Sequence, residues 1–172
     1  MKITLKLVLA IAAVALCSTI SAQNFKLAHI NMEELIVSMP EYDSAMVKMQ
    51  KIQNELETEV ENLQVEYRRK LDDYLKNEAN LTDIVKQSRQ TELQNLGQRI
   101  QTFTESAQQT LEVENGKLMQ PIWEKANKAV ENVAKEQEVT YVFSSNPQIL
   151  IYKAIGTLDL LPAVKNHLGI KK

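Results

Sequence analysis

The sequence of 172 residues has little of several residue types: one cysteine, four glycines, four prolines, and aromatic side chains at only 5% of positions. These scarcities argue against a compact globule with a bulky core. The abundant Ala, Glu, Lys, Leu and Gln residues lose little side-chain freedom in a helix. The composition therefore predicts a mostly helical protein built from long helices.

The first 22 residues are typical of a secretory signal peptide. Lys2 and Lys6 precede an apolar run that ends at Leu16, and small residues then lead to Ala22. The run is too short to be a good membrane span. We expect cleavage after Ala22 and export of the rest of the chain.

The single cysteine, Cys17, lies inside this segment, so we expect a mature chain with no thiol and no disulfide bond. A competing interpretation is lipid attachment at Cys17. It is disfavoured because Leu16 stands where a lipid-attachment motif requires a small residue.

The chain also lacks an excess of basic residues. The chain has 20 basic and 22 acidic residues, and removal of Lys2 and Lys6 leaves 18 against 22, a formal charge of −4. Nucleic-acid binding usually requires a basic face, so a nucleic-acid partner is not expected. The charge is unevenly distributed, because residues 41–67 carry seven acidic side chains against Lys48 and Lys51.

Patterns of catalytic and cofactor-binding residues are missing as well. Gly97 and Gly116 stand alone in helical patterns, so no glycine-rich phosphate loop and no nucleotide site is predicted. His29 and His167 lie far apart without clustered ligands, which argues against a metal site. No nucleophile stands beside a histidine. We expect neither a cofactor nor enzymatic activity.

What the sequence does contain is a pair of apolar seams at helical spacing that mirror each other about residue 79 or 80. Turn-forming residues cluster at that point, from Asn77 to Thr82. The pattern predicts a long antiparallel helical hairpin, a coiled-coil arm over residues 41–119 with its turn near 77–82. Close to the turn, Leu71 and Tyr74 face Ser88 and Arg89, so the seam loses its match there. The seam residues are Tyr42, Met46, Met49, Ile52, Leu56, Val60, Leu63 and Tyr67, and then Leu93, Leu96, Ile100, Phe103, Ala107, Leu111 and Leu118.

Residues 23–40 and 120–172 are predicted to form a small α/β body. We expect strands at 25–30, 139–143 and 149–152, a helix at 32–37 capped by Asn31, and a last helix that is capped by Asp159 and runs through Leu168. Ser38 and Glu41 form a second capping pattern at the start of the first arm helix. Pro121 should kink or restart the second. Such a thin body favours self-association.

Five residues of this body are expected to pack within it or between subunits, and Trp123 is the largest of them. The full set is Leu27, Ile30, Trp123, Val142 and Ile151.

The order of these elements resembles a known family. The stretch KLAHINMEELI at 26–36, the hairpin, residues 126–138, VTYVF at 139–143 and LPAVKNHL at 161–168 together resemble the OmpH-like (Skp) family of periplasmic outer-membrane-protein chaperones. The resemblance implies an α+β, mostly α fold and a homotrimer shaped like a jellyfish. It implies a periplasmic holdase that needs no ATP and encloses unfolded outer-membrane proteins between its arms. A structural or tethering coiled-coil protein of the envelope is the alternative, and a module that grips one defined partner is a third hypothesis.

Basic residues near the turn are candidates for contact with acidic client segments, anionic lipid or lipopolysaccharide, since charge near a tip attracts before contact. The alternative is a solvated helix face. No lipopolysaccharide motif can be carried over from the family. The candidates are Arg68, Arg69, Lys70, Lys76, Lys86 and Arg89.

Overall fold

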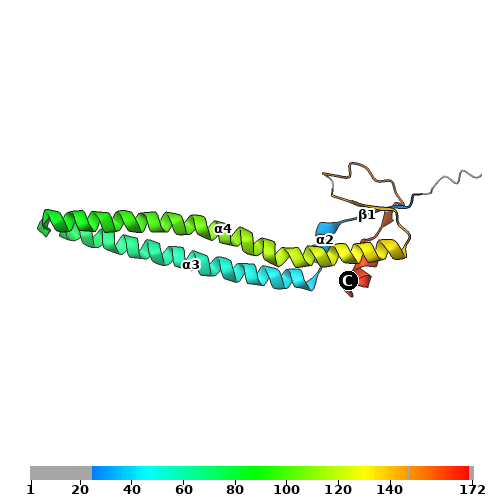
Figure 1. Ribbon diagram of the computed structural model, residues 1–172, viewed down its shortest axis with the longest axis horizontal. Coiled ribbons are helices and arrows are strands. Elements are labelled where there is room, and N and C mark those ends of the chain that lie inside the picture. The colour runs from blue at the N-terminus through cyan, green and yellow to red at the C-terminus, as the bar shows by residue number, and fades with distance from the viewer. Residues whose placement is uncertain (1–24, 147, 171–172) are drawn as a thin grey trace, which may run out of the picture.

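The computed structural model describes residues 25–146 and 148–170, and the predicted signal peptide lies outside them. The protein is mostly helical with one small sheet, as predicted. Two long helices, α3 (Pro40–Asn77) and α4 (Asp83–Glu136), lie side by side and extend well away from the sheet (Figure 1). A short 3-10 helix, η1 (Glu78–Asn80), lies between them where the chain reverses. We call α3 and residues 83–119 of α4 the helix pair, and the remainder the base.

The base begins with strand β1 (Leu27–Ile30) and helix α2 (Met32–Val37). Asn31 caps α2 as predicted, because its side-chain oxygen accepts a hydrogen bond from the Glu34 amide at 3.2 Å. The second predicted cap is wrong. Ser38 instead turns back and donates to the Leu35 carbonyl at 2.7 Å, so α3 starts at Pro40 behind Met39 without a side-chain cap.

The sheet has three strands in the order β2–β1–β3, and both outer strands run parallel to β1. Strand β2 (Tyr141–Ser144) matches the second predicted strand to within two residues. The predicted strand at 149–152 is wrong, because that segment is irregular and the third strand, β3, is the two-residue Leu158–Asp159. Isolated β-type residues do not form a strand unless a neighbouring edge pairs with them.

Helix α5 (Leu161–His167) starts one residue later than predicted, because Leu160 and not Asp159 is its N-cap residue. Asp159 still acts near its start, since its carboxylate accepts from the Leu161 amide at 2.9 Å. Gly169 ends the helix as expected and has a φ of +70°, which glycine adopts without strain.

A kink or a restart was predicted at Pro121. Helix α4 runs unbroken through this residue, so the restart is wrong, and the helix crosses the expected boundary at 119–120. Pro121 is exposed, which lets water satisfy the Lys117 carbonyl that loses its helical partner. Beyond Pro121, α4 packs a buried apolar stripe into the core of the base. The stripe includes Ile122, Ala126 and Val133. Packing of that stripe holds the helix together across the proline.

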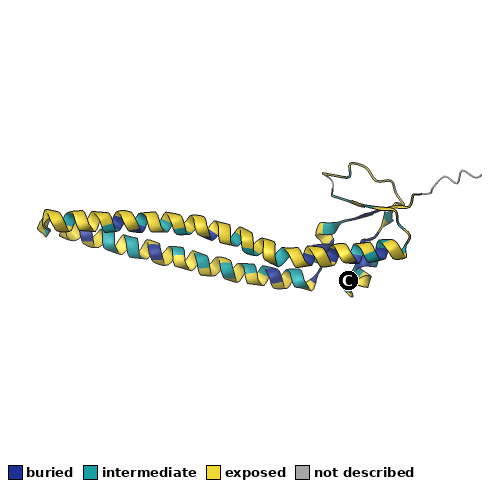
Figure 2. Cartoon of the chain, viewed as in Figure 1, coloured by how far each residue is buried: buried dark blue, intermediate teal, exposed yellow. Residues whose placement is uncertain are grey.

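The main core lies in the base and draws side chains from β1, α2, α5 and the end of α4 (Figure 2). Ile30, Leu35, Met39, Leu160 and Val164 are its largest fully buried side chains. The helix pair has only a thin seam of its own. Its buried members beyond the core are Leu63, Tyr74, Leu93, Leu96 and Ala107.

Candidate functional site

The six basic residues predicted for contact near the turn do not act as one free cluster. Lys70 forms an ion pair with Glu92 across the two helices and lies 3.7 Å from Glu66. Arg89 donates to the other Glu92 oxygen at 2.9 Å. Glu92, which the sequence reasoning missed, therefore neutralises part of the predicted cluster.

The remaining four candidates, Arg68, Arg69, Lys76 and Lys86, form no ion pair within the described residues. Carboxylates are interspersed among them. The stretch that carries these four cations also carries Asp72, Asp73, Glu78 and Asp83. The turn end of the helix pair is consequently a surface of mixed charge.

The five residues predicted to pack in the body divide into two groups. Ile30 is buried and Val142 packs against the core, so both stabilise a single chain. Leu27 is 52% exposed, Trp123 40% and Ile151 95%, so the single chain does not bury these three.

Further exposed apolar residues lie beside Leu27 in the sheet and near Ile151 along the chain. Phe25, Tyr141 and Phe143 form an aromatic row with ring centroids 6.2 Å and 6.4 Å apart. Strand β2, which carries two of these rings, lies at an edge of the sheet. The irregular segment after it exposes Ile149, Ile151, Tyr152 and Ile155. Apolar surface of this extent is typical of an interaction site.

The two histidines lie on different elements of the base. His29 is buried in β1, where its Nε2 lies 3.1 Å from the Thr157 hydroxyl, and His167 is exposed on α5. Across residues 25–146 and 148–170, no three His, Cys, Asp or Glu side chains are grouped as a metal site would require.

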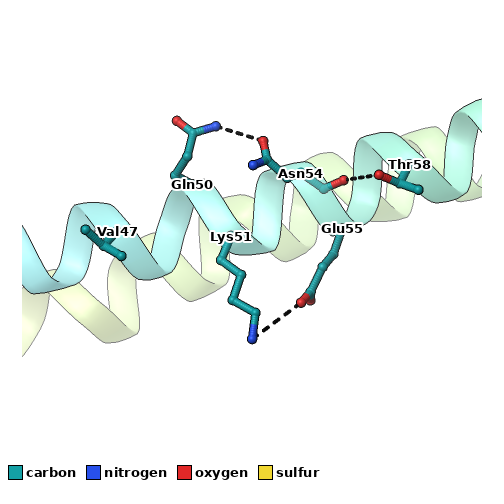
Figure 3. Close-up of a pocket in the computed structure, with 6 residues that line it drawn as sticks. All are labelled: Val47, Gln50, Lys51, Asn54, Glu55 and Thr58. Atoms are coloured by element: carbon teal, nitrogen blue, oxygen red, sulfur yellow. Dashed lines mark hydrogen bonds and ion pairs between the residues drawn. The ribbon is translucent and has the colours of Figure 1, made fainter.

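A shallow surface strip lies on α3 alone, from Val47 to Thr58 (Figure 3). Its polar groups engage one another along the helix: Gln50 donates to Asn54 at 2.9 Å, and Lys51 pairs with Glu55 at 3.7 Å. These contacts between side chains four residues apart stabilise the helix. The strip has no convergent reactive groups.

A second groove lies between α3 and α4 and has a different composition. Leu56 and Val60 of α3 meet Ala107 and Leu111 of α4 along it, and glutamates stand beside them. It belongs to the helix pair and lies away from the core of the base.

Two ion pairs connect α3 with α4, and each lowers the pKa of the glutamate that it contains. Hydrogen bonds from Lys70 and Arg89 lower the pKa of Glu92 below 4.5. At the other end of the helix pair, the hydrogen bond from Lys125 lowers the pKa of Glu41. Both carboxylates therefore remain charged at neutral pH and link the helices at two separated points.

This geometry defines a class of elongated α+β proteins in which a long helix pair extends from a small sheet-containing base. A family model described as "Outer membrane protein (OmpH-like)" matches residues 26–168. The chain belongs to this OmpH-like family.

A solved structure is similar in fold. It is described as a candidate OmpH-like outer membrane chaperone from Caulobacter crescentus CB15, with a TM-score of 0.73 over 84% of this chain and 83% of that chain. The two sequences are 12% identical. No curated protein sequence matches the chain significantly. Within the described residues, none of the helices has the length and apolar character needed to span a membrane.

Proposed function

We propose that this protein is a periplasmic holdase chaperone that binds unfolded outer-membrane β-barrel proteins without ATP and prevents their aggregation. The observation that carries the proposal is the family match over residues 26–168. The similar fold of a protein described as a candidate outer membrane chaperone supports it. Unfolded barrel chains need such protection because their apolar strands and open edges aggregate in water.

We propose further that the protein works as a homotrimer. One chain leaves Leu27, Trp123, Tyr141, Phe143 and Ile151 substantially exposed at or near the base. Association of three bases would cover this apolar surface and stabilise a core too small for independent stability. Three helix pairs would then enclose a sheltered space that admits clients of different size.

The helix pair also suits a binding role. Its buried seam is thin and most of its surface is exposed (Figure 2). Many weak contacts along such a surface hold an unfolded chain without requiring one defined sequence. The uncompensated cations Arg68, Arg69, Lys76 and Lys86 would contribute contacts to acidic client segments, anionic lipid or lipopolysaccharide.

The proposal is tested with the chain that starts at Gln23. Light scattering should give the mass of three chains. An unfolded barrel protein diluted from urea should stay soluble in its presence, equally well with and without ATP. An unrelated globular protein of similar charge serves as the control. A monomeric mass without any suppression of aggregation would contradict the proposal.

A further inference from the structure

The groove between α3 and α4 has an apolar floor. Leu56 and Val60 of α3 and Leu111 of α4 are each half-buried in it, and Ala107 is buried. Such a floor can accept apolar side chains from an extended segment, which would remove part of this surface from water. The floor alone does not select an occupant.

The charge around this groove is mainly acidic, although Arg68 also lines it. Residues 52–67 of α3 and 100–116 of α4, which we call the acidic belt, contain eight glutamates and no lysine or arginine. Three of the eight pair with cations outside the belt: Glu55 with Lys51, Glu66 with Lys70, and Glu114 with Lys117. The other five have no basic partner within the described residues. They are Glu57, Glu59, Glu61, Glu105 and Glu112.

Two of these five, Glu57 and Glu61, line the groove itself. They stand four residues apart on α3, and like charges at that spacing destabilise a helix. Glu57 accepts a hydrogen bond from Gln53 at 2.7 Å, a neutral donor that leaves its charge uncompensated. Arg68 lines the same groove without neutralising either carboxylate. A cation from outside would remove the repulsion and gain two carboxylate contacts.

We infer that this groove binds unfolded segments in which apolar residues alternate with lysine or arginine. This inference rests on the proposed holdase function and adds a preference of charge to it. The apolar side chains would lie over Leu56, Val60 and Ala107, and the cations would reach Glu57 and Glu61. Segments rich in Asp and Glu would be repelled by the acidic belt, so charge would select among clients of equal apolarity.

The test compares two fluorescent peptides of equal length, with identical apolar residues that alternate with Lys in one and with Glu in the other. Anisotropy titrations should show the Lys peptide binding about tenfold more tightly at low salt, and the preference should fall at high salt, where exposed charges are screened. The double variant Glu57→Gln/Glu61→Gln should reduce the preference by about threefold.

The matched control is Asp72→Asn/Glu136→Gln, which removes the same charge from two exposed positions outside the acidic belt. It should leave the preference unchanged. Equal loss in both double variants would show attraction by total charge and overturn the inference. It would also be overturned if Glu57→Gln/Glu61→Gln changed the assembled mass instead of the preference, since a second copy of the chain would then fill the groove.

Suppression of barrel-protein aggregation is measured on the same samples. Suppression without any preference between the peptides would reject this inference and leave the holdase function standing. If the unmodified protein did not suppress aggregation of the barrel protein, the holdase function itself would be rejected.

Discussion

Gln90 of α4 donates a hydrogen bond to the Tyr74 hydroxyl of α3 at 2.9 Å, and Tyr74 donates in turn to Glu78 at 3.0 Å. The ring is buried although the apolar seam has no match for it near the turn. Partial removal from water and the nearby Glu78 carboxylate raise the pKa of the Tyr74 phenol, so it stays protonated at neutral pH. Polar contacts thus continue the pairing of the helices where apolar ones end.

Tyr74→Phe should loosen the turn end without unfolding the helix pair. The variant keeps the ring and removes the hydroxyl that joins Gln90 to Glu78, so both partners lose a hydrogen bond. Hydrogen exchange at residues 70–90 should become faster, with little change elsewhere. Tyr67→Phe is the control, because the Tyr67 hydroxyl has no hydrogen bond within the described residues. Equal exchange in the two variants would show that the Tyr74 hydroxyl has no role in this pairing.

Acid should weaken the link between the helices through Glu92. Lys70 and Arg89 hold the folded-state pKa of Glu92 below its ordinary value of 4.5. The charged carboxylate therefore stabilises the fold fully above that ordinary value, and the stabilisation is lost as the pH falls through the lowered folded-state pKa.

The melting temperature, followed by circular dichroism, should accordingly decline as the pH is lowered below 4.5. Glu92→Gln should melt lower at neutral pH and decline less on acidification. Glu112→Gln, at a position with no ion pair within the described residues, should keep the pH profile of the unmodified protein. A Glu92→Gln profile parallel to that of the unmodified protein would refute the assignment.

Local signals in the sequence predicted the helices well. Asn31 with Glu34 marks the start of α2, and Pro40 is the first residue of α3. The reversal near Asn77 follows from turn residues placed between two seams of helical period. These features depend on contacts between residues close in the chain, which a sequence displays directly.

Features that depend on distant partners were harder to predict. Ile149, Ile151 and Tyr152 have strand-forming side chains, yet β1 pairs with the two-residue β3 instead. A strand that short has no periodicity to detect. The ion pair between Lys70 and Glu92 is likewise hidden, because sequence alone does not show that Glu92 on the other helix lies within reach of Lys70.

Replacement of Trp123 should affect assembly more than the folding of one chain. Trp123 is 40% exposed in the single chain, so a large part of its surface stays available for burial between subunits. If association buries the ring fully, Trp123→Ala would cost the assembly about 3 to 5 kcal/mol. Light scattering across a dilution series should then show dissociation at a higher concentration than for the unmodified protein.

Val113→Ala is the control for this experiment, because Val113 is an exposed apolar residue of α4 that lies in the helix pair. Circular dichroism should show equal helix content in both variants. An unchanged mass for Trp123→Ala at every concentration would place Trp123 outside the subunit interface.

Two glycine replacements should change stability in opposite directions. Gly116 lies within α4, and a Cβ there would meet no atom within 4 Å, so Gly116→Ala should stabilise the fold by about 1 kcal/mol through better helix propensity. Gly169 has a φ of +70° where the chain leaves α5, and the next amide, of Ile170, donates to the Lys165 carbonyl at 2.9 Å.

An alanine at position 169 must either adopt that strained backbone or break the cap, so Gly169→Ala should destabilise the fold by about 1 kcal/mol. Urea unfolding at one fixed protein concentration measures both variants, since association also contributes to stability. Because each substitution adds the same methyl group, opposite shifts isolate backbone conformation as the cause. Shifts of the same sign would show that the added side chain, and not the local backbone, determines the outcome.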